Sequence, residues 1–515
     1  MTQSDDRDTA AERDPTRPAA VLIVGAGFAG LGTAIRLRQA GITDIVILER
    51  GREVGGTWRD NTYPGAACDV PSLLYSFSFA QNSDWSHTYS GSAEILDYIH
   101  GLVDRFQLGS QIQFDTEVSS LVWNAEEGTW TAHTRCGHTV TARAAVMAAG
   151  PLSNASLPDM PGRDTYTGTT IHSARWDHTF DPTGQRIGVI GTGASGVQII
   201  PQLVDQAAQV KVFQRTPGWV IPRLDRQRSE ASKTLFRAAP SLQNLARQAW
   251  FWAHEVFALG VVWTSLATTV LERLAGAYRR RQVHDSWLRR QLTPDYRAGC
   301  KRILVSSDYY PALQRDNCKL ITWPIATLSP RGIRTADGIE HELDAIVFAT
   351  GFDVCKTSAP FPVHGVDGAS LDDAWAEGAH AYRSVTTAGF PNLFLTFGPN
   401  SGPGHNSALV YMESQIAHIT EAIRVIVEDD LRALEVRRDR EQDHNRWLAR
   451  RLARTTWNSG CHSWYLTADG RNTTMYPGFA TQFAKHTAPV DLADYQIQQR
   501  SVSSLGVQPD LGGRL

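Results

Sequence analysis

Residues 20–30 read AVLIVGAGFAG, an apolar run followed directly by three glycines in the spacing GxGxxG. A helical periodicity continues to Gln39, so the stretch predicts a strand, a tight turn and a helix. Gly25 permits the turn, Gly27 lets the backbone approach a pyrophosphate, and Gly30 lets the helix pack against the strand. Because the amino end of a helix attracts anions, the stretch predicts a dinucleotide-binding unit.

The residue after the second predicted strand narrows the choice of nucleotide. That strand covers residues 44–48 and is followed by Glu49. A carboxylate at this place accepts hydrogen bonds from a ribose hydroxyl pair and repels a 2′-phosphate. A lone GxGxxG hexapeptide also occurs by chance in a glycine-rich chain, but the strands, the helix and Glu49 together favour FAD at this loop.

The same order of elements returns in the middle of the chain. A predicted strand at 186–190 leads into GTGASG at 191–196, which is followed by a helical stretch to about Ala207 and a strand at 210–213. The chain therefore contains two predicted dinucleotide sites.

The second site ends differently from the first. No acidic residue follows its last strand, and the chain reads Gln214-Arg215-Thr216 instead. The guanidinium of Arg215 is a planar donor fork that suits a 2′-phosphate, so this loop predicts NADP(H). The alternative is that Arg215 is only a solvated surface charge.

Two short apolar runs predict where the chain passes between domains. AVMAAG at 145–150 and IVFATG at 346–351 each read as a strand ending in glycine, and each would close one nucleotide-binding unit, although either could be an ordinary buried strand. Their order predicts an α/β fold with two Rossmann-like dinucleotide-binding domains, the NADP(H) domain being inserted within the FAD domain. The predicted parts are a disordered tail at 1–18, FAD-binding segments at 19–155 and 351–515 with a mobile loop near 461–475, and an NADP(H)-binding domain at 156–350 with a helical insertion at about 225–298.

Composition sets limits on partners and on compartment. The chain has 515 residues, which leaves room for about three domains. Its net charge is −3, so it lacks the excess of positive charge that is typical of nucleic-acid-binding proteins. The first 18 residues are polar, which predicts a disordered tail rather than a signal peptide. Six cysteines lack CxxC spacing, so neither a redox dithiol nor a zinc or other metal site is expected, and we expect a cytoplasmic protein with reduced thiols.

The predicted helical insertion has an apolar middle. Residues 249–274 are rich in Trp, Phe, Leu and Val, but His254 and Glu255 interrupt them. No uncharged run reaches the roughly 20 residues that span a bilayer. One interpretation is a helical hairpin packed on its own core. The other is an apolar wall for a lipophilic substrate, or a weak contact with a membrane surface.

Three further segments carry unusual residues close together. Residues 55–69 read GGTWRDNTYPGAACD, residues 166–177 read YTGTTIHSARWD, and residues 299–302 read GCKR. A lysine such as Lys301 adds a point charge for a phosphate. Each of these residues is ambiguous when it is considered singly, because aromatic residues are more often core and acids more often caps.

Together these motifs resemble those of the type I Baeyer–Villiger monooxygenases, which are class B flavoprotein monooxygenases. The resemblance covers nearly the whole chain after the tail, and it includes both glycine loops, residues 55–69, residues 166–177 and Ala349-Thr350-Gly351. One departure is Tyr166, where the family signature usually begins with Phe.

The resemblance implies a role for each matching position. Arg302 matches the active-site arginine over the flavin, and Asp69 the carboxylate that orients it. The residues implied in FAD binding are Gly25, Gly27, Gly30, Glu49, Thr57, Trp58, Asp69, Tyr75, Val118 and Arg302. Those implied in NADP(H) binding are Gly191, Thr192, Gly193, Ser195, Gly196, Gln198, Arg215, Thr216, Lys301 and, on the mobile loop, Trp464. The signature positions are Gly168, His172 and Trp176, of which His172 would act through domain motion or would simply be a packed histidine.

The implied reaction uses NADPH and O₂ to insert one oxygen atom beside the carbonyl of a ketone, giving an ester or lactone. A flavin C4a-peroxide would attack the carbonyl, while Arg302 stabilises anionic oxygen and Asp69 holds the guanidinium. We expect the ketone to be lipophilic.

Two alternatives of other kinds remain at this point. A nitrogen- or sulfur-oxygenating flavin monooxygenase shares both loops but does not need Arg302, and a non-catalytic NADPH or redox sensor would have lost motif residues that are present here. A disulfide reductase would need a CxxC motif.

Overall fold

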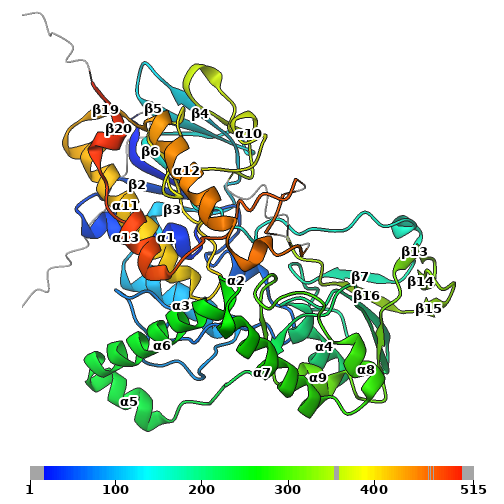
Figure 1. The fold of residues 1–515 in the computed structure, drawn as a ribbon. Coiled ribbons are helices and arrows are strands. Elements are labelled where there is room, and N and C mark those ends of the chain that lie inside the picture. Colours follow the sequence, from blue (N-terminus) through cyan, green and yellow to red (C-terminus); the bar gives the residue numbers. More distant parts are fainter. Residues whose placement is uncertain (1–16, 353–358, 462, 464, 468, 501–515) are drawn as a thin grey trace, which may run out of the picture.

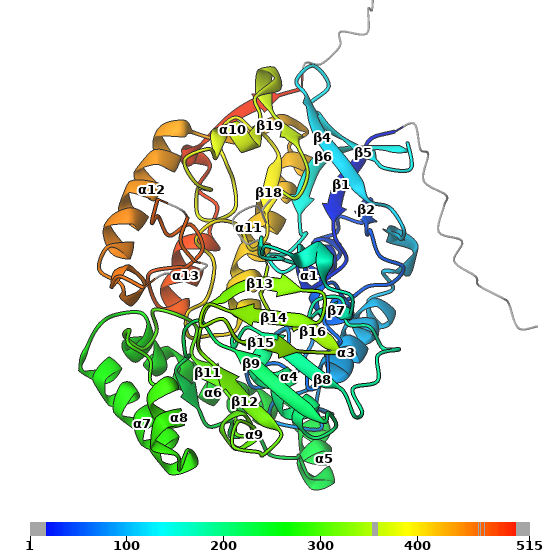
Figure 2. The same ribbon diagram turned by 90° about the vertical axis from the view of Figure 1, so that its right-hand side faces the viewer.

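The computed structural model describes residues 17–352, 359–461, 463, 465–467 and 469–500. Two sheets form its two halves, and helices pack on both (Figures 1 and 2). This arrangement confirms the predicted α/β class with two dinucleotide-binding units.

The first sheet combines parallel and antiparallel strands. Its order is β17-β4-β5-β6-β1-β2-β3, and β18 also pairs with β6. Strands β6, β1, β2 and β3 are parallel, while β4, β5 and β6 form an antiparallel meander. The strands are β1 (Ala19–Val24), β2 (Ile45–Leu48), β3 (Ile112–Gln113), β4 (Val118–Asn124), β5 (Thr129–Thr134), β6 (Thr139–Met147), β17 (Val363–His364) and β18 (Leu393–Leu395).

Helix α1 (Phe28–Gln39) follows β1 through the first glycine loop. A Cβ atom on Gly30 would lie 1.9 Å from the carbonyl oxygen of Gly25, so only glycine lets the helix begin this close to the turn. Helices α11 (Ala408–Glu428) and α3 (Ser92–Arg105) pack against α1 and complete the largest apolar core.

The second sheet is entirely parallel, in the order β12-β9-β8-β16-β7. Its central strands are continuous apolar runs, as expected where both faces of a sheet are covered. Helix α4 (Gly196–Val204) follows β8 through the second glycine loop. The strands are β7 (Thr169–His172), β8 (Arg186–Ile190), β9 (Gln209–Phe213), β12 (Cys318–Ile321) and β16 (Ala345–Phe348).

The chain passes between the two sheets twice, and the two passages lie side by side. Ala155 and Phe352 form an antiparallel bridge. The backbone N–H of Ser156 donates to Gly351 O over 2.9 Å, and the Thr350 hydroxyl donates to Ser156 O over 2.6 Å. After the second passage the chain returns to the first sheet, where β18 pairs with β6.

Four helices form the predicted insertion: α5 (Glu230–Ala238), α6 (Pro240–Val261), α7 (Leu266–Gln282) and α8 (Ser286–Gln291). A capping box of Ser265 and Thr268 starts α7. Helices α6 and α7 meet at 97° and share an apolar cluster, and each also buries residues against other elements, so the insertion packs on the rest of the protein as well as on itself.

The remaining elements connect and cover the two halves. The other strands are β10 (Val220–Ile221), β11 (Leu304–Val305), β13 (Ile325–Ser329), β14 (Gly332–Thr335), β15 (Glu340–Glu342), β19 (Leu431–Val436) and β20 (Tyr495–Gln499). The other α-helices are α2 (Thr57–Asp60), α9 (Tyr309–Ala312), α10 (Leu371–Ala374), α12 (Arg438–Leu452) and α13 (Ala480–Thr487).

Candidate active site

The first glycine loop forms a close-fitting turn. Gly25 has φ +107°, and a Cβ atom there would lie 2.6 Å from Ala148 O. Glu49, which is buried, accepts hydrogen bonds of 2.8 Å from the backbone of Ala26 and Gly51 and from Arg59 Nη1. Glu49 therefore fixes the loop itself, and three of the roughly four acceptor positions of its carboxylate are already occupied by the protein.

Two of the aromatic residues expected beside the flavin contact each other. The Trp58 indole N–H donates to the Tyr75 hydroxyl over 3.1 Å, and the Tyr75 ring packs edge-on against Phe28, the first residue of α1. Thr57 begins the short helix α2. Val118 is buried at the start of β4, opposite Thr134.

Asp69 and Arg302 form a two-pronged ion pair. Arg302 Nε donates to Asp69 Oδ2 over 2.8 Å and Nη2 to Oδ1 over 2.7 Å. The two side chains remain 22% and 40% exposed, so the pair faces open space. Burial alone would raise the pKa of Asp69, but the charge and hydrogen bonds of Arg302 outweigh it and hold that pKa below its usual value. The residues lie 233 positions apart in the sequence, and the structure brings them together as predicted.

Arg223 and Tyr465 lie near this pair. Sequence reasoning missed Arg223, and it placed Tyr465 in the predicted mobile loop without giving it a role. The charge of Arg223 also lowers the pKa of Asp69. Burial raises the pKa of Tyr465 to about 12, and the nearby charge of Arg302 opposes that rise. Tyr465 packs in an apolar cluster with Trp457 and Met475.

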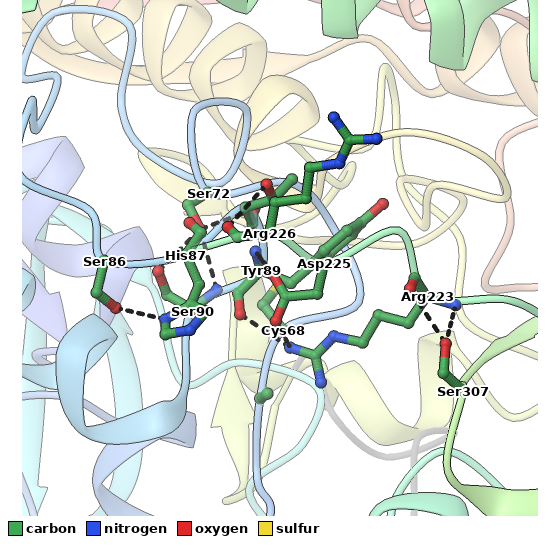
Figure 3. A network of polar contacts seen from close by, with 12 residues as sticks. Cys68, Ser72, Ser86, His87, Tyr89, Ser90, Arg223, Asp225, Arg226 and Ser307 are labelled. Atoms are coloured by element: carbon green, nitrogen blue, oxygen red, sulfur yellow. Dashed lines mark hydrogen bonds and ion pairs between the residues drawn. The ribbon is translucent and has the colours of Figure 1, made fainter. Parts of the chain in front are cut away.

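Arg223 belongs to a network that joins the segment after β10 to the segment before α3 (Figure 3). Its Nη2 donates to Tyr89 O over 2.8 Å, and its guanidinium lies 5.5 Å from the Tyr89 ring centroid. Asp225 accepts from Tyr89 N, while the hydroxyl of Ser307 accepts from Arg223 N and donates to Arg223 O. These contacts tie the two halves together beside Asp69.

Gln198, on α4, links the second glycine loop to residues 55–69. Its amide oxygen accepts from the Tyr63 hydroxyl over 3.0 Å, and its amide nitrogen donates to Ala67 O over 3.0 Å. Gln198 was expected to contact NADP(H), and in this structure its amide holds the segment that carries Asp69.

The second glycine loop repeats the geometry of the first. Gly191 has φ +109°, and a Cβ atom there would lie 2.4 Å from Ala349 O. A Cβ on Gly196 would lie 2.4 Å from Gly191 O, whereas one on Gly193 would meet nothing within 4 Å. Thr192 is buried, and Ser195 is the N-cap of α4. Gly191 and Gly196 therefore pack tightly against neighbouring backbone, while Gly193 has free space beside its Cα atom.

Arg215 and Thr216 follow β9, and Lys301 precedes β11. Arg215 is exposed, and Thr216 is half-buried beside it. Burial and then the positive charge of Arg215 lower the pKa of Lys301, whose Nζ lies 5.0 Å above the Tyr296 ring. Two cations that repel each other at an open site are suited to an anion between them.

A disulfide joins Cys300, which precedes these cations, to Cys461. The expectation of reduced thiols throughout is wrong for this pair, because two cysteines 161 positions apart meet in space. Cys68, Cys136 and Cys318 are free. The bond fastens the segment that leads to Tyr465 onto the segment that carries Lys301 and Arg302.

Of the signature residues, His172 lies beside the two passages between the sheets. His172 is buried at the end of β7, where its Nδ1 accepts from Ala174 N, and its ring packs edge-on against Phe352. Gly168 is needed because a Cβ there would lie 2.3 Å from the Tyr166 hydroxyl. Trp176 packs against Phe180. Trp464 lies outside the described residues.

Comparison with known proteins identifies relatives across nearly the whole chain. Residues 22–235 match the family model described as pyridine nucleotide-disulphide oxidoreductase. A protein of Streptomyces coelicolor named Baeyer–Villiger monooxygenase is 44% identical over 490 residues, which cover 95% of this chain and 94% of the relative.

Solved structures share the fold over the same length. An oxidised steroid monooxygenase bound to NADP superposes with a TM-score of 0.83 at 31% identity, covering 94% of this chain and all of the other. A protein called OTEMO, in complex with FAD and NADP, gives a TM-score of 0.84 at 26% identity with the same coverage.

Proposed function

The chain belongs to the Baeyer–Villiger monooxygenase family, and on this premise we propose that Asp69, Arg302 and the two glycine loops form one active site for the oxidation of a lipophilic ketone. The enzyme uses FAD, NADPH and O₂ and converts its ketone into an ester or a lactone. The observation that carries the site assignment is the two-pronged pair of Asp69 and Arg302, which faces open space.

The residues present fit both nucleotides. The loop at Gly25 is compatible with FAD because it opens a helix at a turn where no Cβ fits, and the acidic Glu49 disfavours a 2′-phosphate. The loop at Gly191 suits NADP(H) because Gly193 is open and Arg215 and Lys301 bring two positive charges near each other. We assign FAD to the first loop and NADP(H) to the second.

We propose domain boundaries near residues 155 and 350. The bridge between Ala155 and Phe352 and the hydrogen bond between Ser156 and Gly351 support this choice. The predicted FAD-binding parts are then 19–155 and 351–515, around an NADP(H)-binding part at 156–350. A cytoplasmic location stays a prediction.

Arg302 stabilises negative charge during the reaction. Bound FAD, once reduced by NADPH, supplies the activated oxygen. Arg302 remains cationic at any working pH and can donate to the oxygen on which negative charge develops as the ketone carbonyl is attacked. Asp69 is its positioning residue, because two parallel hydrogen bonds hold the plane of the guanidinium.

Two apolar clusters lie next to the segment of Arg302 and suit a lipophilic ketone. Ile303 is buried in one cluster with Trp219 and Val261, and Tyr465 is buried in another with Trp457. A dry site strengthens the charge stabilisation by Arg302 and disfavours loss of the activated oxygen as hydrogen peroxide.

The test separates cofactor reduction from oxygen transfer. We expect Arg302→Ala to keep flavin reduction by NADPH within a few-fold of the wild type, and to lower ester formation on the order of 10²–10³-fold. The measurement combines stopped-flow flavin absorbance with mass spectrometry of products from linear, cyclic, aromatic and polycyclic ketones. Arg302→Lys is the matched variant, since it keeps the charge and loses the two-pronged contact. Ester formation by Arg302→Ala at the wild-type rate would contradict the proposal.

A further inference from the structure

Helix α6 carries an apolar stripe that points away from the protein. Its members are exposed by 43–67%, although residues of this kind are normally buried. They recur at helical spacing along one side of the helix, which lies along the lower edge of the molecule in Figure 1. The stripe consists of Leu242, Leu245, Trp252, Val256 and Leu259.

Helix α7, bent by 97° from α6, carries a second exposed apolar stripe. Leu266 is 87% exposed, Val270 53% and Leu274 63%, at spacings of four residues. The second half of the same helix exposes arginines on the same side: Arg273, Arg280 and Arg281. We call the exposed apolar residues of α6 and α7 with these three arginines the α6–α7 face.

No exposed carboxylate balances these arginines within residues 240–282, all of which the structure describes. Glu255 is buried and accepts hydrogen bonds from His405, Asn406 and the amino end of α13. Glu272 accepts from Ala298 N and pairs with an arginine beyond α8. The α6–α7 face is therefore both apolar and positively charged.

The same helices are fastened to the protein along their other sides. No single described helix is long and apolar enough to cross a membrane; α6 and α7 reach that length and composition only as a bent pair. Arg247 donates to the carbonyl oxygens of Leu73 and Leu74, and Glu255 holds α6 to α13. Because crossing a bilayer would break these buried contacts, the face can only lie against a surface.

We propose that the α6–α7 face docks the enzyme on an anionic lipid bilayer. Apolar side chains enter the headgroup boundary, and arginines beside them attract anionic lipid, a combination that binds helices lying in the plane of a membrane. A second copy of this chain fits the face less well, because a two-fold interface there would bring its arginines together.

The docking face adjoins the active site through backbone packing. Gly299, with φ +93°, passes so close to the end of α6 that a Cβ would lie 2.4 Å from Val261 O. Lys301 and Arg302 follow directly. The end of α6 therefore contacts the segment that carries the reactive arginine.

The first experiment measures flotation of the FAD-loaded full-length protein with vesicles of phosphatidylcholine and phosphatidylglycerol in equal parts. Val256→Gln/Leu266→Gln should lower the partition coefficient at least tenfold. The matched control, Ile339→Gln/Ile497→Gln, removes two exposed aliphatic side chains elsewhere and should bind as the wild type does.

The second experiment tests charge. Arg273→Gln/Arg280→Gln/Arg281→Gln should weaken binding to the anionic vesicles about a hundredfold. Arg424→Gln/Arg438→Gln/Arg450→Gln removes the same charge from other exposed positions and should have little effect. Wild-type binding should fall with added salt, and pure phosphatidylcholine vesicles should bind less.

The outcomes distinguish a lipid bilayer from a second copy of this chain as the partner that binds the α6–α7 face. Loss of vesicle binding in both α6–α7 variants and not in their controls supports the bilayer. The proposal is overturned if the wild type does not float with anionic vesicles. It is also overturned if the variants and their controls float equally. A dimer in light scattering that Val256→Gln/Leu266→Gln dissociates, without vesicle binding, assigns the face to a second copy instead.

Discussion

Individual cations near the active site differ in how their charge is compensated. Arg302 is paired through two hydrogen bonds with Asp69. Lys301, its neighbour in the sequence, feels the positive charge of Arg215, which contributes to its lowered pKa. A bidentate ion pair is suited to holding a side chain in place, and two neighbouring cations are suited to binding an anion. Arg302 is therefore suited to a fixed position in the active site, and Lys301 to binding a phosphate.

Replacing Arg215 should change the preference between nicotinamide cofactors. We expect Arg215→Ala to weaken NADPH about 10–100-fold, because it removes charge-assisted hydrogen bonds to the 2′-phosphate, and to leave NADH nearly unchanged. Dissociation constants come from the dependence of flavin reduction on each cofactor. Arg424→Ala, at another exposed position, is the control. An equal loss for both cofactors would remove the 2′-phosphate assignment.

Elements that lie far apart in the sequence are joined at the site by a covalent bond. Cys300 and Cys461 connect the segment before β11 to the segment after α12. Trp457 and Tyr465 flank this connection in one apolar cluster. The bond limits how far the second segment can move from Arg302.

Removing the bond should loosen the site without disabling cofactor reduction. We expect Cys461→Ser to lower the free energy of unfolding by about 5 kcal/mol, which the chain-entropy model gives for a separation of 161 residues. It should also divert NADPH consumption from ester to hydrogen peroxide, because water reaches the site more easily. Urea unfolding and a peroxide assay measure these effects. Cys136→Ser, at an exposed free thiol, should change neither.

Local patterns were sufficient to predict the elements that hold the nucleotides. Strands β1 and β8 and the helices after them follow from apolar runs and glycine spacing, and the structure confirms them. Such patterns depend on neighbours in the sequence, so they are visible in it.

Contacts between segments that lie far apart in the chain could not be predicted from such local patterns. Cysteine spacing could not pair Cys300 with Cys461, and nothing in the sequence placed Arg223 against Tyr89. The bend between α6 and α7 was also missed, because it depends on which surfaces the rest of the fold offers them. Asp69 and Arg302 were paired correctly only through the family resemblance.

Across the whole molecule, several histidines are buried in the neutral form. Burial lowers the pKa of His418 and of His444 from 6.5 to about 4. The unfolded chain then binds more protons than the native chain below about pH 6.5, so stability falls as the pH falls. His380 opposes this trend, because Glu441 raises its pKa.

We therefore expect the unfolding free energy to decrease on acidification from pH 7 towards pH 4. Each of the two histidines contributes on the order of 1.4 kcal/mol per pH unit within that window. Urea unfolding at a series of pH values measures the slope, and His444→Gln should reduce it. A flat profile between pH 7 and pH 5 would contradict this account.

The pairing of β18 with β6 has a consequence for synthesis on the ribosome. Leu393 pairs with Ala145, and every strand of the second sheet is translated between them. Strand β6 cannot pair with β18 until β18 has been synthesised. The first sheet therefore keeps an unpaired strand edge while the strands of the second sheet are synthesised. An unpaired strand edge is a template for wrong pairing. Slow translation before residue 395 should therefore promote aggregation of the nascent chain more than slow translation after it.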